Sequence, residues 1–205
     1  MRLRLTFQKT EAMRYTSHLD LYRTWERTLR RANLPLAYTQ GFSPHPRLNL
    51  GAALPLGFTS ECELIDIWLD GDYTPEQVSQ ALQPALPPGL MVTHIEQVAA
   101  NAPALQQEIQ AAEYLITLLD PCPDLSKRLE KLCAAEHLPR ERRGKSYDLR
   151  PLILEIQLLP PQDELPRFLV CLTAREGATG RPEEVLTEMG LAQHAARIHR
   201  KRLLL

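Results

Sequence analysis

The fold is indicated first by residues 2–9, Arg2-Leu3-Arg4-Leu5-Thr6-Phe7-Gln8-Lys9, in which apolar and polar residues alternate. Successive side chains of a β-strand point to opposite faces, so this alternation predicts a strand with one apolar face. The other face carries Arg2 and Arg4, and we expect that face to meet solvent.

The next segment has the pattern of an amphipathic helix. Ser17 is suited to cap its first turn, and Asp20 stands where a carboxylate favours the positive end of a helix. An apolar stripe follows at helical spacing, and the pattern ends at Asn33-Leu34-Pro35.

The remaining elements of the first half complete the order βαββαβ. An apolar stretch at residues 48–56 precedes strands that we expect at Cys62–Leu69 and Leu90–Val98. Between these two strands, Thr74-Pro75-Glu76 has the cap and the first-turn proline of a helix start. This order is that of a ferredoxin-like unit.

The same order recurs after residues 99–110, which are rich in Ala, Gln and Asn. We expect a strand at 113–119, a helix at 124–135, strands near 149–159 and 167–174, a helix at 182–189 and a strand near 196–204. The sequence therefore predicts an α+β protein of two tandem ferredoxin-like (βαββαβ) units, residues 1–98 and 111–205, joined by a connector.

The net charge of −1 hides an uneven distribution of charged residues. Residues 1–60 carry nine Lys/Arg and three Asp/Glu. Residues 61–120 carry no Lys/Arg and ten Asp/Glu, and residues 121–205 carry fifteen Lys/Arg and twelve Asp/Glu. If the basic segments share one side of the fold, an anionic partner becomes plausible. No apolar run approaches the roughly 18 residues of a membrane span, so we expect a cytoplasmic protein without a membrane partner.

The cysteines do not indicate a metal site. Cys62, Cys122, Cys133 and Cys171 are far apart and form no close pair, so neither a disulfide framework nor a zinc or iron–sulfur site is signalled. The usual nucleotide-binding, esterase and zincin motifs are missing too. We expect no metal on this chain, and each cysteine to act as a small buried hydrophobe.

The predicted first helix has a basic face. Its arginines recur at i, i+4, i+7 and i+8 and so share one side of the helix: Arg23, Arg27, Arg30 and Arg31. Guanidinium groups suit phosphate, and this face is a candidate for binding RNA or a partner. The alternative is a solvated polar face that acidic neighbours such as Glu26 partly neutralise.

The segment Gln40-Gly41-Phe42-Ser43-Pro44-His45-Pro46-Arg47 is the most unusual local feature. Gly41 permits a positive φ, and each proline favours an extended conformation at the residue before it. The result should be a stiff loop that displays Phe42, His45 and Arg47, either to contact an unpaired base or to seat a partner. The alternative is a packing loop with Phe42 in the core.

A second basic stretch runs from Arg140 to Arg150. Its candidate binding residues are Arg142, Arg143, Lys145 and Arg150, and Gly144 permits a turn among them. These charges can clamp a backbone phosphate, or the stretch can be a solvated hairpin.

His18, Asp20 and His45 are the set that invites a catalytic or metal-binding interpretation. His18 and Asp20 are two residues apart at a helix start and do not face the same way, so their spacing favours structural roles. A recognisable self-contained catalytic centre is therefore missing, and a non-catalytic role is favoured over an enzymatic one.

Several of these segments together resemble one bacterial family. They are Ser17-His18-Leu19-Asp20, the Arg-rich helix, Leu34-Pro35, Tyr38, residues 40–47, Ala53-Leu54-Pro55-Leu56-Gly57 and Asp148-Leu149-Arg150-Pro151-Leu152. The combination looks like the uncharacterised radical SAM-associated (radical SAM-linked) family, a domain of unknown function. Its members are encoded beside a radical SAM protein or fused to one.

The resemblance implies a radical SAM partner and makes ribosomal or transfer RNA a reasonable substrate. The closely spaced three-cysteine cluster motif of such enzymes is missing here. Any [4Fe-4S] cluster and S-adenosylmethionine are therefore expected on the partner, and no cofactor is expected on this chain.

Three hypotheses follow. The first is an accessory module that presents RNA to the radical SAM enzyme through the basic helix face and the 40–47 loop. The second is a protein–protein docking module that uses the same loop without touching RNA. The third is an RNA-processing enzyme that uses His18, Asp20 and His45, which rests on fold analogy alone.

Overall fold

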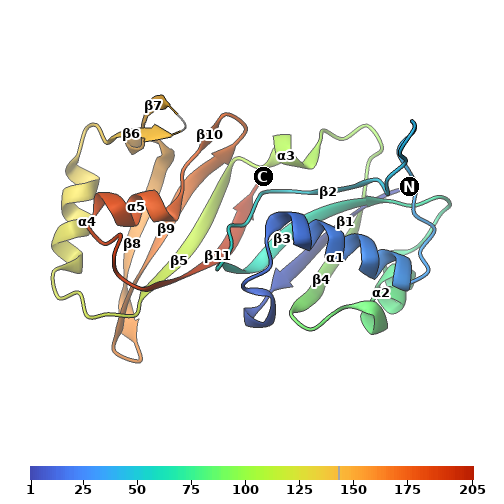
Figure 1. Cartoon of the computed structure of the whole chain (residues 1–205), viewed down its shortest axis with the longest axis horizontal. Coiled ribbons are helices and arrows are strands. Elements are labelled where there is room, and N and C mark those ends of the chain that lie inside the picture. The colour runs from blue at the N-terminus through green and yellow to red at the C-terminus, as the bar shows by residue number, and fades with distance from the viewer. Residues whose placement is uncertain (143) are drawn as a thin grey trace. The chain divides into compact units, whose positions relative to one another are not determined.

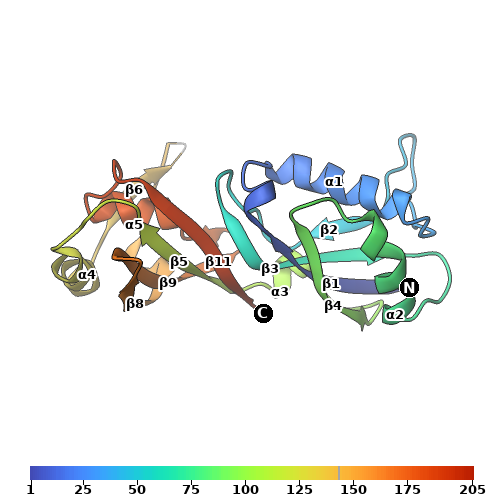
Figure 2. The same ribbon diagram turned by 90° about the horizontal axis from the view of Figure 1, so that it is seen from below.

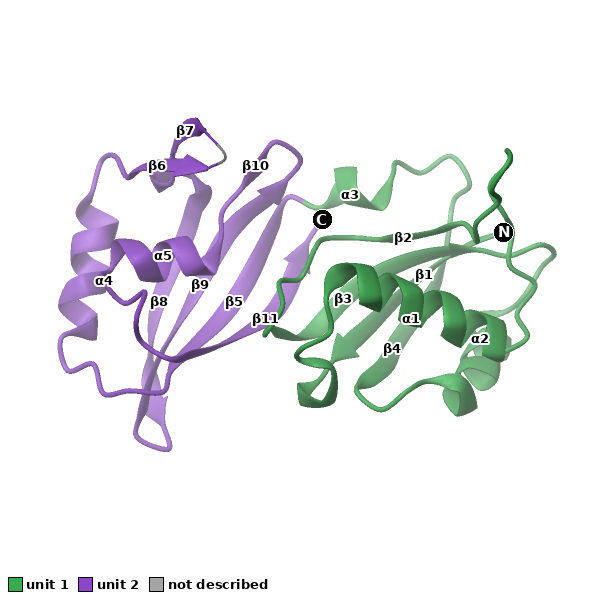
Figure 3. Cartoon of the chain, in the orientation of Figure 1, with its two compact units in different colours: residues 1–109 green, residues 110–205 purple. Residues whose placement is uncertain are grey.

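The computed structural model describes residues 1–142 and 144–205, so the candidate residue Arg143 lies outside the described residues. The architecture is α+β, as the sequence predicts. The chain divides into two compact units, Met1–Ile109 and Gln110–Leu205 (Figure 3). Residues 99–109, which we expected to act as a connector, belong to the first of them.

The first unit has four strands and three α-helices, which Figure 1 shows in blue to light green. They are β1 (Arg2–Lys9), α1 (His18–Arg31), β2 (Leu48–Leu50), β3 (Thr59–Trp68), α2 (Pro75–Leu82), β4 (Leu90–Val98) and α3 (Leu105–Glu108). Short 3₁₀ helices, η1 (Glu11–Met13) and η2 (Gln83–Ala85), follow β1 and α2. Strand β1 pairs antiparallel with β3 and with β4, and β3 pairs antiparallel with β2, which gives the order β2-β3-β1-β4.

Helices α1 and α2 cover the apolar face of β1. Leu3, Leu5 and Phe7 are fully buried there and belong to one core cluster with residues from both α1 and α2. Trp25 of α1 meets Phe7 edge-on, with ring centroids 4.8 Å apart and planes at 70°. This aromatic pair fixes the helix on the sheet through burial and favourable ring geometry.

Both expected helix starts in the first unit are confirmed. The Ser17 hydroxyl accepts a hydrogen bond from the Asp20 N–H at the start of α1. Thr74 and Gln77 form a reciprocal capping box at the start of α2. These side chains satisfy backbone N–H groups that the first turn leaves without a partner, and they explain why the sequence locates both starts.

The expectation that the polar face of β1 meets solvent is wrong. Arg2 and Arg4 are only 4% and 5% exposed, and both guanidinium groups bind the fully buried carboxylate of Asp66 on β3. The distances from Arg2 Nη2 to Asp66 Oδ2 and from Arg4 Nε to Asp66 Oδ1 are 2.5 Å and 2.8 Å. An alternating strand therefore buries both of its faces, because its cations have an anion opposite them.

The segment after β4 covers this buried ion pair. Arg2 donates hydrogen bonds to the carbonyls of Ala102 and Pro103, and Arg4 binds Glu108 over 2.6 Å. Burial opposes the charge on Arg4, but the hydrogen bonds to Asp66 and Glu108 outweigh it and raise the pKa of its guanidinium. The ion network thus ties residues 99–109 to the sheet of the first unit.

The second unit repeats the alternation of strands and helices and adds a hairpin. Its elements are β5 (Ala111–Leu118), α4 (Leu125–Ala134), β6 (Pro139–Arg142), β7 (Lys145–Asp148), β8 (Ile153–Gln162), β9 (Leu165–Arg175), β10 (Ala178–Thr179), α5 (Pro182–Glu188) and β11 (Ala196–Leu204). Strand β5 pairs antiparallel with β9 and β11, β9 pairs with β8 and β10, and β6 pairs only with β7.

Two features of the second unit differ from the sequence prediction. The predicted order of elements contains no strands at residues 139–148, where β6 and β7 form a hairpin, so the alternative in which the basic stretch is a hairpin is confirmed. Strand β8 starts at Ile153, later than expected, because Arg150–Leu152 form a 3₁₀ helix, η3, around Pro151. A proline lacks the N–H that a strand would use, which explains the later start.

Within residues 1–142 and 144–205, none of the helices is both long and apolar enough to cross a membrane.

We predict that Asp66→Asn lowers the free energy of unfolding of the first unit by about 3–5 kcal/mol, because it removes the buried counter-charge of Arg2 and one of the two counter-charges of Arg4, which keeps Glu108. The two tryptophans of the chain, Trp25 and Trp68, both lie in this unit, so tryptophan fluorescence during urea denaturation reports on it. Asp70→Asn, at an exposed position just after the same strand, is the control and should change little. Equal effects of the two variants would contradict a central role for the ion pair.

Candidate functional site

The chain after α1 folds back on itself as a narrow loop. Tyr38 and Pro46 form an isolated antiparallel bridge. The Thr39 N–H donates to the His45 carbonyl over 2.8 Å, and the His45 N–H donates to the Thr39 hydroxyl over 3.0 Å. These bonds close the base of the loop and leave residues 40–44 as its tip.

The tip of the loop displays Phe42, whose relative exposure is 110%. Gln40 and Ser43 are exposed as well. Gly41 has a φ of 131°, which side-chain-bearing residues rarely adopt, so the turn needs glycine there. The predicted display of Phe42 is confirmed, and the alternative in which it packs into the core is wrong.

The far stem of the loop is fixed by Trp68 at the end of β3. The Arg47 guanidinium lies over the Trp68 ring, 4.9 Å from its centroid, and the Arg2 guanidinium lies 5.2 Å from the same centroid. The Trp68 N–H also donates to the Arg47 carbonyl over 3.1 Å. Because Arg2 belongs to the buried ion pair, the position of the loop is linked to the core by stacking and hydrogen bonds.

Sequence reasoning missed Trp68 as a residue of this site. Nothing in its local sequence signals a role, because the contact with Arg47 joins two segments that pair only in the folded sheet. Tyr38, 45% exposed beside the loop, was noted only as part of the family resemblance.

The basic face of α1 is present and exposed. Arg23 lies 3.6 Å from Asp20, Arg30 lies 2.8 Å from Glu26, and their side chains are 68% and 54% exposed. Such exposed ion pairs are weak, so both cations stay available to an anion. Arg27 is exposed and has no hydrogen-bond or ion-pair partner among the residues that the structure describes.

Arg31 differs from the other three arginines of the helix. Its guanidinium donates to the carbonyl of Ala85 in η2 over 3.3 Å, so it is directed toward the α2 side of the unit. All four predicted arginines are therefore exposed, but Arg31 also makes a hydrogen bond within the first unit.

The loop and the helix meet at one end of the first unit. In both views the loop continues beyond the last turn of α1 and projects from the unit, at the right of the picture (Figures 1 and 2). We define the basic–aromatic surface as the exposed side chains of this helix and loop: Arg23, Arg27, Arg30, Phe42, His45 and Arg47. It combines cations with one exposed ring.

The possible catalytic set is not brought together. His18 is the first residue of α1, whereas His45 belongs to the loop beyond its last turn. The helix has 14 residues and is about 21 Å long at 1.5 Å per residue. Asp20 accepts a hydrogen bond from the Ser17 hydroxyl over 2.7 Å and so serves the helix start. Among the described residues, no group of three His, Cys, Asp or Glu side chains gathers as metal ligands would.

The second basic stretch is largely engaged within its own unit. Arg142 binds Glu184 of α5 over 2.6 Å, and although burial opposes its charge, that hydrogen bond raises the pKa of the guanidinium. Arg150 donates to the carbonyls of Ala135 and Ile153. Lys145 is exposed. Two of the predicted binding residues therefore hold the hairpin and η3 in place.

Asp148 organises the base of the β6–β7 hairpin. Its carboxylate binds His137 over 2.8 Å and accepts hydrogen bonds from the backbone N–H groups of Leu138 and Arg150. The hydrogen bond with His137, followed by the two backbone donors, lowers the pKa of Asp148 to about 2.

Comparison with known proteins assigns the chain to a family. Residues 2–182 match the family described as "Uncharacterized protein conserved in bacteria (DUF2344)". The chain belongs to this family. The match covers residues 2–109 of the first unit and most of the second, so it spans the residues of both the basic–aromatic surface and the β6–β7 hairpin. Comparison with curated proteins gives no match.

Two solved structures of complexes contain a chain with a similar fold. A chain in a Cbf5–Nop10–Gar1 complex aligns with a TM-score of 0.54 and 13% identity. The alignment covers 98% of the present chain and 48% of the chain from the complex. A chain in an H/ACA RNP bound to a substrate RNA containing 2′-deoxyuridine aligns with a TM-score of 0.50 and 14% identity. This alignment covers 98% of the present chain and 47% of the chain from the RNP. This chain spans about half the length of both. At such identities the likeness shows a shared fold.

The low pKa of Asp148 gives a testable pH dependence. A depressed carboxyl pKa stabilises the folded state above its unfolded value of 3.8, and that stabilisation is lost as the pH falls through about 2. We expect the Asp148 carboxyl to titrate near pH 2 by NMR and to move toward its ordinary value in His137→Ala. An ordinary pKa in the unsubstituted protein would contradict the hydrogen-bonded geometry.

Proposed function

We propose that this protein is an accessory module that binds RNA at the basic–aromatic surface and presents it to a partner enzyme of the radical SAM class. The observation that carries the proposal is Phe42, an aromatic side chain held fully in solvent at the tip of a fixed loop that follows the arginine-bearing helix α1. A ring this exposed among the described residues is positioned to contact another molecule.

The chemistry of the surface suits a single-stranded segment of RNA. An exposed ring can stack on an unpaired base, and guanidinium groups can bind the phosphates on either side of that base. Arg27 is uncommitted, and Arg23 and Arg30 have only weak ion pairs to give up. The likeness in fold to a chain of an H/ACA RNP bound to a substrate RNA also supports the proposal that this protein binds RNA.

The fold that we propose for this module is a pair of ferredoxin-like units. In the first, the order βαββαβ and the antiparallel arrangement β2-β3-β1-β4 support this. In the second, the pairings β8-β9-β5-β11 support it, with the β6–β7 hairpin and β10 as additions.

The partner enzyme would carry the reaction chemistry. The resemblance to radical SAM-linked proteins supports such a partner, and it would bind the iron–sulfur cluster and S-adenosylmethionine. The four cysteines of this chain come from separate elements and are free thiols. Ribosomal or transfer RNA in the cytoplasm is the substrate that we propose for the pair.

We predict that Phe42→Ala weakens binding of a fluorescein-labelled single-stranded RNA oligonucleotide by roughly 5- to 150-fold, the loss of one base–aromatic stack of about 1–3 kcal/mol. Fluorescence anisotropy measures the affinity. Arg27→Gln should weaken binding and reduce the slope of log K against log salt by about 0.7, because one phosphate contact is lost.

Lys127→Gln is the matched control for Arg27→Gln. Lys127 is an exposed cation on α4 of the second unit and lies outside the proposed surface. It should leave both the affinity and the salt slope unchanged. Absence of binding at low salt, or equal losses in the two variants, would remove the RNA proposal.

A second candidate function, docking to the partner enzyme without RNA contact, is favoured by a different observation. Tyr15, Leu19 and Leu56 are 76%, 70% and 60% exposed near the N-terminal end of α1. Reciprocal hydrogen bonds between Arg14 and Gly57 hold their two segments side by side. Exposed apolar side chains that gather in this way mark protein contacts.

Nuclease treatment separates the two functions. After RNA is digested, co-purification of the neighbouring radical SAM protein that survives in Phe42→Ala but not in Leu19→Glu would assign docking to this apolar cluster. Loss of co-purification on digestion alone would mean that RNA bridges the two proteins, as the first function requires.

A further inference from the structure

Strand β4 leaves one edge of the first sheet open. It pairs antiparallel with β1 along one side, and it ends the strand order of the described residues on the other. Its ladder with β1 is regular from His94 to Val98, and it shifts once, between the partners of Thr6 and Phe7. The outer backbone groups of this strand are therefore available to another strand.

This edge carries one register shift and one charged residue, Glu96, but few of the other features by which proteins protect an edge. Residues 90–98 contain no lysine, arginine or proline, the residue types that most often discourage pairing. The other edges that the strand order leaves open are protected. Strand β10, at the opposite end of the order, has only two residues, β2 has three, and β8 carries Pro160 and Pro161. An open, nine-residue edge without such residues is suited to pairing.

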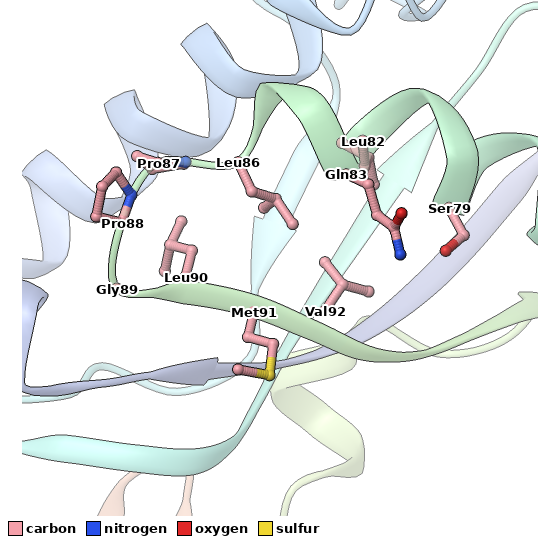
Figure 4. A pocket seen from close by; sticks show the side chains of 10 residues that line it. All are labelled: Ser79, Leu82, Gln83, Leu86, Pro87, Pro88, Gly89, Leu90, Met91 and Val92. Atoms are coloured by element: carbon pink, nitrogen blue, oxygen red, sulfur yellow. The ribbon is translucent and has the colours of Figure 1, made fainter.

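The side of β4 that faces the helices is apolar and incompletely covered. Ile95 and Val92 lie opposite Leu5 and Phe7 of β1 and pack against the same core while they remain partly exposed. Between α2 and this strand is a groove of about 420 Å³, into which Leu86 and Val92 project (Figure 4). A neighbouring groove of about 370 Å³ continues along the strand to Ile95.

The polar side of β4 carries an imidazole, which can become a cation, and a carboxylate, which is an anion. His94 and Glu96 are both exposed, and their side chains share one face, with Nε2 and Oε2 3.9 Å apart. They stand one residue before and one residue after Ile95. A strand with this pattern is complementary to itself when it runs antiparallel to a copy about Ile95.

We propose that a second copy of this chain pairs with the β4 edge, antiparallel, with the twofold axis at Ile95. In this register His94 lies opposite Glu96 of the partner subunit, and Glu96 lies opposite His94 of the partner subunit. Shifting the axis to His94 or to Glu96 places like groups opposite each other, which disfavours those registers. The pairing joins two sheets edge to edge and brings the partly exposed apolar residues of both copies together.

The test is the mass of the protein in solution. We expect light scattering after size exclusion, over a wide range of protein concentration, to approach twice the chain mass of 23.3 kDa. Ile95→Lys places two cations opposite each other on the axis and should abolish the dimer. Gln157→Lys, the matched control at an exposed position of β8, should leave the mass unchanged.

A charge exchange tests the register. His94→Glu and Glu96→Lys should each weaken dimerisation roughly tenfold, because the first creates two like-charge pairs across the axis and the second removes both His–Glu pairs. The double variant His94→Glu/Glu96→Lys restores opposite charges and should recover the dimer. Tryptophan fluorescence checks that each variant is folded.

Two results would overturn the proposal. A monomer at every concentration would mean that β4 is open to a different chain or to none. A dimer that persists in Ile95→Lys, or a double variant no better than the single ones, would place the contact elsewhere.

Discussion

The first unit depends on one buried carboxylate. Asp66 binds Arg2 and Arg4 of the neighbouring strand, and the two arginines in turn bind the carbonyls and the Glu108 carboxylate of the covering segment. Without this anion, the buried Arg2 would lose its counter-charge and the buried Arg4 would keep only Glu108. A buried charge without a counter-charge is far more costly than a charge in water. The sheet and the segment that covers it are therefore held together by a single constraint.

The contacts of Arg2 connect this buried ion network to the candidate site. Arg2 contacts Asp66 on one side and the ring of Trp68 on the other, and Trp68 supports Arg47 at the stem of the loop. The loop thus rests on a chain of contacts that begins in the core. A fixed loop gives up less conformational entropy on binding, so an exposed ring at its tip is an effective contact point.

Much of the fold was predictable because its signals are local. Helix caps, first-turn prolines and alternation are properties of a few adjacent residues, and they located β1, both helix starts of the first unit and most strands of the second. The stiff loop was predictable for the same reason, since Gly41 and two prolines limit its backbone. The β6–β7 hairpin was predicted only as an alternative for the basic stretch, because charged residues at its strand positions hide the periodicity.

The sequence by itself determined the order of the elements and the loop that displays Phe42, because backbone preference and periodicity act over short distances. Only the tertiary structure decided which arginines are buried in ion pairs and which face solvent. Arg4 and Arg27 are the same residue type, yet one is buried against Asp66, 62 residues away in the chain, and the other is exposed. Burial of a charge depends on which distant segments meet around it, and no local pattern contains that information.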